Sequence, residues 1–331
     1  DRPGPGDDAR RMGPEYRDGA SMLFHSINRG KRSVVLDLKS AEGREALFAL
    51  LAEADILLHN LRPGEAERLG LGADALRERF PRLVYCELSA FGHAGPRRLQ
   101  PGYESLLQAY SGLMGTNGEP DQPPVRISAS VVDEGTALWT VIGALAALHE
   151  RRRTGQGRAV RTSLLETALT WSSHRILGEV NEGRTSQRLG SSHTSLVPYR
   201  PYEAADGPLM ITAGNDRLFA KLAECLGHPE WGRDPRFTTN PQRIVHRETL
   251  DRMITEVLRT RTRAEWEVVL AAAGVPAAAV NTLSEAIAEP QVQAIGIIQP
   301  VPGSEGVLTG LPITFDGERP AIPGWGPALD E

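Results

Sequence analysis

The stretch Ser128–Gly157 constrains the fold more than any other part of the sequence. Its middle, Ala137–Leu148, is apolar almost all the way round the helix that the composition predicts. A helix that is apolar on every side belongs in a protein core. The run is shorter than the roughly 20 apolar residues that a membrane-spanning helix needs. The cations Arg151–Arg153 suit the negative end of the helix dipole, and Gly155 suits the cap just beyond it. We therefore expect one core helix around which the rest of the chain is organised.

Two acids, Asp133 and Glu134, stand at the entrance of this helix, where the dipole favours carboxylates. Asp is a preferred N-cap residue, so Asp133 could simply begin the helix. Alternatively, the backbone N–H donors keep its carboxylate ionised, and an ionised carboxylate can attack a carbonyl carbon. The sequence leaves both interpretations open, because one residue can do both.

The overall composition narrows the class of protein. The 331 residues suffice for one large or two ordinary domains. The 37 basic and 42 acidic residues give a net charge of −5, so no basic field indicates a nucleic-acid partner. Cys86 and Cys225 form no disulfide framework and no metal motif, which fits a reducing, cytoplasmic setting. The histidines show no metal-ligand spacing, and no segment indicates a leader or a membrane span, so we expect neither a metal nor a membrane partner.

The first part of the chain alternates between strand and helix patterns. The expected strands are Ser33–Leu38, Asp55–His59 and Arg82–Leu88, separated by a helix at Ala41–Ala54 and shorter helical pieces up to Phe80. This alternation predicts βαβ units and a parallel sheet. Parallel sheets bind ligands in the loops beyond the carboxyl ends of their strands. The loops that qualify are Lys39-Ser40, Asn60–Gly64 and Ser89–Gly95.

The pattern of predicted strands and helices changes near Ser195. A strand at Arg158–Thr162 and a helix from about Leu164 precede it, and Asn181–Gly190 reads as a linker. The segments beyond predict a smaller α+β unit and a Pro/Gly-rich tail with a strand at Gly306–Pro312. Its expected strands and helices are Leu209–Ala213, Asp216–Leu226, Arg247–Arg259, Arg263–Ala273 and Val275–Asn281. We expect an α/β protein with a large domain over 1–190, a small domain over 191–295, and a return to the large domain over 296–331.

Several polar residues have both a structural and a functional interpretation. Arg29, Lys31 and Arg32 form a basic cluster that is either a solvated face or a phosphate contact; Arg68 has the same two readings. The segment with Arg29, Lys31 and Arg32 contains a single glycine, so it has no P-loop or dinucleotide-binding fingerprint. Tyr103 is typical of a half-buried packing residue. Glu104 beside a pocket could tune the pKa of a nearby acid.

A set of stretches spread over nearly the whole chain, in order, carries a family resemblance. They are Asn28–Leu38, Asn60–Gly64, Arg68–Leu71, Tyr103–Met114, Val131–Trp139, Ala146–Gly157, Asp234–Arg243, Pro276–Asn281 and Glu289–Val292. Together they resemble the class III CoA-transferase family, which includes formyl-CoA transferase and carnitine CoA-transferase. The resemblance implies a Rossmann-like large domain made from both chain ends, a smaller α+β domain between them, and an interlocked homodimer.

The resemblance also implies a mechanism in which the acid at the helix entrance, Asp133, is the nucleophile. It would attack an acyl-CoA and pass through an aspartyl anhydride and an aspartyl-CoA thioester before a carboxylic acid takes up the CoA. This covalent route needs no cofactor beyond the coenzyme A of the substrate. We count Glu104 with Asp133 as catalytic. The implied CoA contacts are Arg2, Lys39, Asn60, Leu61, Arg68 and Tyr103, which makes them preferable to the Arg29–Arg32 cluster.

The sequence departs from the family pattern in places that suggest alternatives. It starts after the family's first strand and helix, which hold a glutamine that positions the acyl group. This departure motivates one alternative, a non-catalytic CoA-binding relative or an inactive fragment. An acyl-CoA racemase of the same superfamily is another, but its GHD-type motif reads Gly102-Tyr103-Glu104 here. The run Arg188–Asn215 is similar to the branch that uses succinyl-CoA and a dicarboxylate such as glutarate. Within it, His193 and Arg200 are candidate contacts for a second carboxylate.

Overall fold

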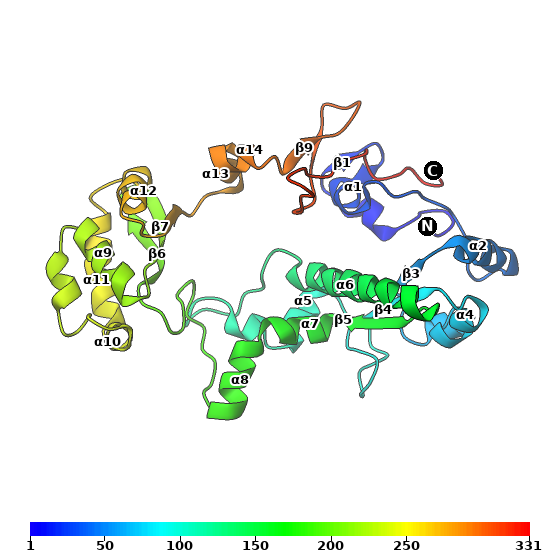
Figure 1. The fold of residues 1–331 in the computed structure, drawn as a ribbon, viewed down its shortest axis with the longest axis horizontal. Helices are drawn as coiled ribbons and strands as arrows, with labels where there is room; N and C mark the ends of the chain where they lie inside the picture. Colours follow the sequence, from blue (N-terminus) through cyan, green and yellow to red (C-terminus); the bar gives the residue numbers. More distant parts are fainter. The chain divides into compact units, whose positions relative to one another are not determined.

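The computed structural model describes residues 1–331, which divide into two compact units (Figure 1). Unit 1 comprises Asp1–Gly102, Asp133–Glu166 and Leu283–Glu331; unit 2 comprises Tyr103–Val132 and Thr167–Thr282. Two helices, α6 (Val131–Thr154) and α7 (Leu164–Trp171), begin in one unit and end in the other. The predicted domain boundaries at 190/191 and 295/296 stay a prediction.

Unit 1 is built on a parallel sheet of strand order β3-β4-β5. β3 (Ile56–His59) pairs with β4 (Val84–Ser89), which pairs with β5 (Ala159–Ser163). The predicted α/β class with a parallel sheet is therefore confirmed. The other elements of unit 1 are η1 Asp8–Arg11, β1 Tyr16–Arg17, β2 Ala20–Ser21, α1 Met22–Asn28, α2 Ala41–Glu53, α3 Glu65–Arg68, α4 Ala73–Arg79, α13 Leu283–Ala288, α14 Pro290–Ala294, β9 Ile298–Pro300 and β10 Val307–Thr309.

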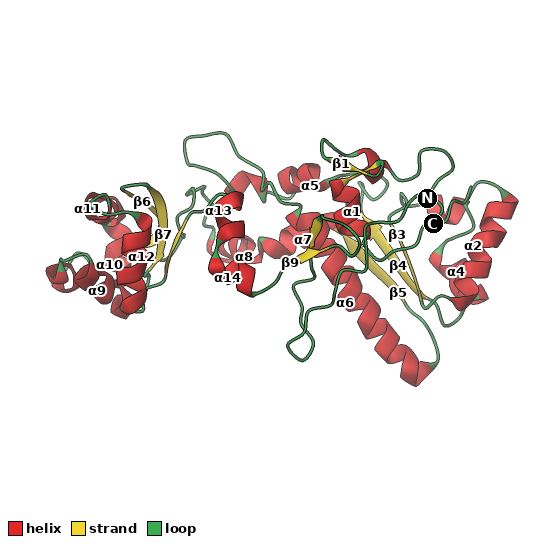
Figure 2. Cartoon of the chain, turned by 90° about the horizontal axis from the view of Figure 1, so that it is seen from above, coloured by secondary structure: helices red, strands yellow, loops and turns green.

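The two faces of this sheet carry different side chains because successive strand residues alternate between faces. On one face, Val84 and Cys86 pack against Ala144 and Ala147 of α6. On the other, Tyr85 joins the core formed with α2, α3 and α4. Figure 2 shows the three strands side by side, with α6 along them and α2 and α4 beyond β3. The chain around β4 is thus buried on both faces, as in other parallel sheets.

The helix α6 differs from the sequence prediction in length and in exposure. It is 24 residues long, and by length and composition alone it could cross a membrane; core helices of soluble proteins meet the same criteria. It is buried along the side that meets the sheet. Four large apolar residues on another side are exposed in the single chain, so the expectation of a helix buried all round is wrong for the chain by itself. These residues, called below the exposed side of α6, are Leu138, Val141, Ile142 and Leu145.

The predicted strand at Ser33–Leu38 is absent, and this prediction was wrong. The backbone there bonds to the two chain ends instead of to a sheet. The Ser33 N–H donates to the Glu331 carbonyl at 2.6 Å, and the Leu36 N–H donates to the Asp1 carbonyl at 3.1 Å. The β-branched composition predicted an extended chain but could not specify its partner.

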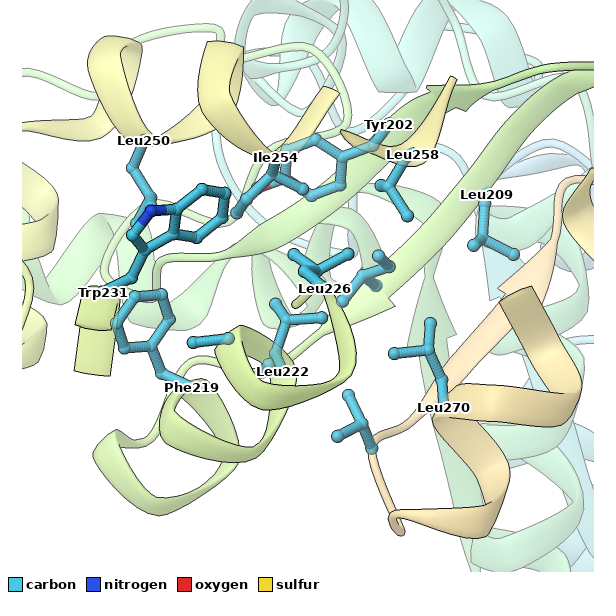
Figure 3. Packing of buried hydrophobic residues seen from close by; sticks show 14 of the residues in the cluster. Tyr202, Leu209, Phe219, Leu222, Leu226, Trp231, Leu250, Ile254, Leu258 and Leu270 are labelled. Atoms are coloured by element: carbon cyan, nitrogen blue, oxygen red, sulfur yellow. The ribbon is translucent and has the colours of Figure 1, made fainter. Parts of the chain in front are cut away.

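Unit 2 holds an antiparallel sheet of order β6-β7-β8 covered by helices. Figure 3 shows its core, where Phe219, Leu222 and Trp231 face Leu250 and Ile254 of α11. This sheet and the helices packed on it lie in the part of the chain after Ser195, where the sequence predicted strands and helices of a smaller α+β unit. Its elements are α5 Glu104–Tyr110, η2 Met114–Thr116, α8 Ser173–Glu182, β6 Tyr199–Ala204, β7 Gly207–Thr212, α9 Asp216–Cys225, η3 Pro229–Arg233, α10 Asn240–Val245, α11 Arg247–Leu258, α12 Arg263–Ala272 and β8 Ala277–Ala279.

A buried arginine organises one end of this core. The guanidinium of Arg243 donates to the carbonyls of Val197, Phe237 and Gly214 at 2.6–2.9 Å and to Asp216 Oδ1 at 2.8 Å. Burial lowers the pKa of Arg243, with the Asp216 carboxylate acting against that effect. A buried charge is tolerated only when its donors are satisfied, and these bonds provide that.

Candidate active site

The carboxyl edge of the parallel sheet is the natural place for a site in unit 1. β3, β4 and β5 end at His59, Ser89 and Ser163, and the loop after β3 begins with Asn60 and Leu61. The register pairs His59 with Glu87 and Ser89 with Ser163, so the three strand ends meet at one edge.

The direction of α6 brings its first turn to this same edge. Thr140 Oγ1 lies 2.7 Å from Thr162 Oγ1, near the end of β5. Farther along the helix, a Cβ added to Gly143 would lie 2.6 Å from Val160 Cγ1, nearer the start of β5. The helix therefore runs opposite to the strands, and residues before Thr140 extend beyond their carboxyl ends.

Asp133 lies in the first turn of α6, and its residue is exposed. The helix begins at Val131, so Asp133 is inside the turn and not the N-cap residue before it. The first-turn N–H groups and the helix dipole favour a carboxylate at this position. The position suits an ionised nucleophile accessible to a ligand.

A pocket of about 700 Å³ lies in unit 1 and contains two of the predicted CoA contacts, Arg2 and Asn60. Lys31 and Arg32, which the sequence interpretation had ranked below those residues, line the same pocket. Its other lining residues are Asp1, Gly6, Asp7, Asp8, Phe24, Asn28, Ser33, Val34, Leu36, Leu38, Leu47, Leu50 and Pro327. Arg2 makes an ion pair with Asp8, and Asp1 and Asp7 also line the pocket, so its polar part carries both charges. The cations next to an apolar wall suit a ligand that combines phosphates with apolar groups.

The remaining predicted contacts of unit 1 stand outside the lining of this pocket. Lys39 is exposed and follows the lining residue Leu38 in the chain, and Leu61 follows Asn60. Arg68, at the end of α3, makes an ion pair of 3.3 Å with Glu65 and is mostly exposed. The structure thus brings Arg2 and Asn60 together and leaves the others on flanking segments.

Tyr103 and Glu104 begin α5 in unit 2 and have opposite surroundings. Tyr103 is 76 % exposed in the single chain, so its interpretation as a half-buried packing residue was wrong. The carboxylate of Glu104 is buried and accepts hydrogen bonds from the Val132 N–H at 3.0 Å and from Gln108 Nε2 at 2.6 Å. Gln108 also accepts from the Ile127 N–H at 2.8 Å.

Glu104 therefore caps the start of α6 from a neighbouring element. Its carboxylate satisfies a backbone donor of Val132, the residue that precedes Asp133 in the chain. The helix dipole favours the Glu104 carboxylate at the start of α6, as it favours the carboxylate of Asp133. The hydrogen bonds of Glu104 thus hold the backbone next to Asp133, and its assignment as a catalytic residue stays a prediction.

A polar cluster at the carboxyl edge was missed by sequence reasoning. Glu87 is buried and lies 3.3 Å from Arg161 Nε and 3.7 Å from His93 Nδ1. His59 Nε2 lies 2.6 Å from the Tyr85 hydroxyl. The available signal was positional, because His59 directly precedes Asn60 and alternation places His59, Tyr85 and Glu87 on one face of the sheet.

Arg200 and His193, the candidate contacts for a second carboxylate of the substrate, have partners within unit 2. Arg200 NH1 lies 3.2 Å from Asp251 Oδ2, and Asp251 also accepts from the Tyr202 hydroxyl at 2.6 Å. Burial and the Asp251 charge raise the pKa of Tyr202. His193 Nδ1 accepts from the Ser195 N–H at 3.1 Å. Arg200 is thus held by a carboxylate of the protein itself.

Comparisons with known proteins identify the family of the chain. The model of CoA-transferase family III matches residues 1–331. The acetyl-CoA:oxalate CoA-transferase of Acetobacter aceti is 34 % identical over 327 residues, covering 97 % of this chain and 83 % of that protein. The succinate–glutarate CoA-transferase of Agrobacterium fabrum is 33 % identical over 315 residues, covering 93 % and 78 %. A solved CAIB/BAIF family protein from Brucella suis has a TM-score of 0.87 at 33 % identity, covering 99 % and 88 %.

The chain belongs to CoA-transferase family III. The predicted family and the predicted enzyme class, a class III CoA-transferase, are confirmed.

The buried carboxylate of Glu104 gives a direct test of how the start of α6 is held. In Glu104→Gln, one of the two acceptor oxygens becomes an amide donor that faces the donors of Val132 and Gln108. We expect the free energy of unfolding to fall by about 1–3 kcal/mol, because buried groups lose partners. Urea denaturation measures the change. The exposed Glu203 provides the control, since Glu203→Gln should leave the midpoint unchanged. An unchanged midpoint in Glu104→Gln would contradict this role.

Proposed function

We propose that this protein transfers CoA from an acyl-CoA to a small carboxylic acid, with Asp133 as the nucleophile. The observation that carries the proposal is the placement of an exposed Asp in the first turn of α6, beyond the carboxyl edge of a parallel sheet. The pocket with Arg2, Lys31 and Arg32 in the same unit supports a phosphate-bearing ligand.

The proposed reaction proceeds in four bond exchanges. An Asp133 oxygen attacks the thioester carbonyl and expels CoA thiolate, which leaves a mixed anhydride. The thiolate then attacks the Asp133 carbonyl and releases the first carboxylate, which carries away one oxygen of Asp133. The acceptor carboxylate attacks the resulting aspartyl-CoA thioester, and the thiolate returns to the acceptor carbonyl. The covalent intermediates divide one difficult transfer into easier steps. No cofactor beyond the CoA of the substrate is required.

Other residues have supporting roles in this proposal. Arg2, Lys39, Asn60, Leu61, Arg68 and Tyr103 contact CoA, and Glu104 fixes the segment that precedes Asp133 through the Val132 N–H. Dicarboxylic acids are the proposed acceptors, because the relatives are named for oxalate and glutarate. The free thiols Cys86 and Cys225 are consistent with a proposed cytoplasmic location.

We also propose a homodimer. The exposed side of α6 presents Leu138, Val141, Ile142 and Leu145 at helical spacing. A continuous row of exposed apolar side chains on a helix is typical of a surface that another chain covers. The implied interlocked arrangement stays part of this proposal.

The nucleophile is tested by Asp133→Asn, with Glu134→Gln as a control on an exposed carboxylate in the same turn. Removing the nucleophile should lower turnover by at least about 10³-fold, while CoA binding measured by calorimetry stays unchanged. Hydroxylamine should trap an activated acyl group on the unmodified protein and on Glu134→Gln only. Turnover retained in Asp133→Asn would refute the assignment.

The pocket is tested by comparing Arg2→Ala with Arg29→Ala. Arg29 belongs to the same basic motif as Lys31 and Arg32, but it donates to the Ser26 carbonyl and does not line the pocket. Loss of a charged phosphate contact should weaken CoA binding roughly tenfold or more in Arg2→Ala, and the difference should shrink in high salt. Equal dissociation constants for the two variants would place CoA elsewhere.

The homodimer is tested by light scattering on Ile142→Glu. The unmodified protein should have twice the 35.9 kDa mass of one chain, and a charge on the exposed side of α6 should lower the mass toward that of one chain. Val268→Glu, at another exposed apolar residue, is the control and should remain dimeric. A single-chain mass for the unmodified protein would contradict the proposal.

A further inference from the structure

A chain of three hydrogen bonds connects the loop after β3 to the loop after α3. The Leu61 N–H donates to His59 Nδ1 at 3.2 Å. His59 Nε2 lies 2.6 Å from the Tyr85 oxygen. The Tyr85 hydroxyl donates to the Leu71 carbonyl at 3.1 Å. The two loops are thus joined through side chains of β3 and β4.

These bonds determine where the proton of His59 lies. A phenol has one proton, and in Tyr85 it goes to the Leu71 carbonyl, so the Tyr85 oxygen accepts from His59 Nε2. Nδ1 must then use its lone pair to accept from the Leu61 N–H. His59 is therefore neutral with hydrogen on Nε2. A second proton on Nδ1 would place two donors opposite each other and break the bond to Leu61.

The surroundings favour the neutral form. Burial lowers the pKa of His59 and outweighs the opposing charges of Glu87 and Glu67, while His93 lowers the pKa further. Burial, with the charges of Glu87 and Glu67, also raises the pKa of Tyr85, so the phenol keeps its proton. Since the folded pKa of His59 is below its ordinary value of 6.5, the neutral form predominates at that pH and above. It is lost as the pH falls from 6.5 through the folded pKa.

Both loops joined by these bonds carry proposed CoA contacts. Asn60, which lines the pocket, lies between His59 and Leu61 in the chain. Leu71 follows the end of α3, which carries Arg68. The bond from His59 to the N–H two residues later has the pattern of an Asx turn, a common way to fix a loop.

We propose that His59 and Tyr85 are positioning residues for coenzyme A, which hold the Asn60–Leu61 and Arg68–Leu71 segments while His59 is neutral and release Leu61 when His59 is protonated. The proposal rests on the proposed function, because it concerns the same CoA site. It adds a dependence of CoA affinity on pH that the CoA contacts alone do not predict.

The test measures CoA dissociation constants of the full chain by calorimetry between about pH 5 and pH 8, the range in which a histidine changes charge. In the unmodified protein, affinity should fall roughly threefold to tenfold toward the acid end, the effect of one lost hydrogen bond. His59→Asn keeps an acceptor for the Leu61 N–H without a titrating group, so its affinity should stay near the unmodified value and vary less with pH. His59→Phe and Tyr85→Phe should bind CoA more weakly over the whole range.

Two histidine variants serve as controls. His93→Asn removes the other histidine that faces this cluster, and His228→Asn removes an exposed one that pairs with Glu230 in unit 2. His228→Asn should retain the pH dependence of the unmodified protein. His93→Asn removes a charge that lowers the pKa of His59, so it should keep the pH dependence but move it to higher pH. The same pH slope in His59→Asn, or unchanged CoA affinity in His59→Phe, would overturn the proposal.

A second measurement separates this proposal from the proposed function. Imidazole ¹⁵N spectra report the tautomer of His59 without any ligand, and the Nε2–H form is expected at neutral pH and should disappear on acidification. A charged imidazole or an Nδ1–H tautomer at neutral pH would overturn the hydrogen-bond chain itself. The spectra could show the expected tautomer while neither the unmodified protein nor any variant binds CoA. In that case the proposed function fails, and the positioning role fails with it.

Discussion

The packing of α6 on the parallel sheet is the contact on which the rest of the site depends. Small side chains at Gly143, Ala144 and Ala147 let the helix approach β4 and β5 closely. The hydroxyl pair Thr140–Thr162 fixes its axial position at 2.7 Å. Because the helix runs opposite to the strands, its positive end lies beyond their carboxyl ends. A carboxylate in the first turn therefore gains from the helix dipole at the edge where α/β proteins bind ligands.

The polar groups near this edge are held by one another as well as by the backbone. Glu87 meets Arg161 and His93, and His59 meets Tyr85. Such networks fix loop positions because a buried polar group without a partner lowers the free energy of unfolding by more than one hydrogen bond adds to it. In unit 2, Glu104 plays a comparable part by accepting from the Val132 N–H.

Much of the fold could be predicted from the sequence, because local patterns decide it. The helix predicted at Ala41–Ala54 is found at Ala41–Glu53, and its Ser40 side chain accepts from the Gly43 N–H as a cap should. The alternation of strand and helix patterns along the chain likewise predicted the strands β3, β4 and β5. The segment Ser33–Leu38 failed because its hydrogen-bond partners are the chain ends, about 300 residues away in the case of Glu331. A composition window contains no information about such partners.

The candidate site was less predictable, for a physical reason that differs between residues. The position of Asp133 at a helix entrance could be predicted because it is a local property, whereas its role as the nucleophile was implied by the family resemblance and stays a prediction. The packing interpretation of Tyr103 was wrong because exposure depends on tertiary packing, and Tyr103 is 76 % exposed; its assignment as a CoA contact stays a prediction. Lys31 and Arg32 line one pocket with Arg2, an arrangement that only the folded chain shows. The bonds of His59 needed the register of two strands, which the sequence does not specify.

The central claim, that Asp133 exchanges an oxygen with its substrates through a covalent anhydride, is tested most directly by isotope transfer. The protein would be turned over with an acceptor acid whose carboxylate carries ¹⁸O, and the peptide that contains Asp133 would be analysed by mass spectrometry. The account predicts that ¹⁸O replaces ¹⁶O in the Asp133 carboxylate after turnover. An Asp133 peptide that stays unlabelled while the product acyl-CoA forms would contradict it.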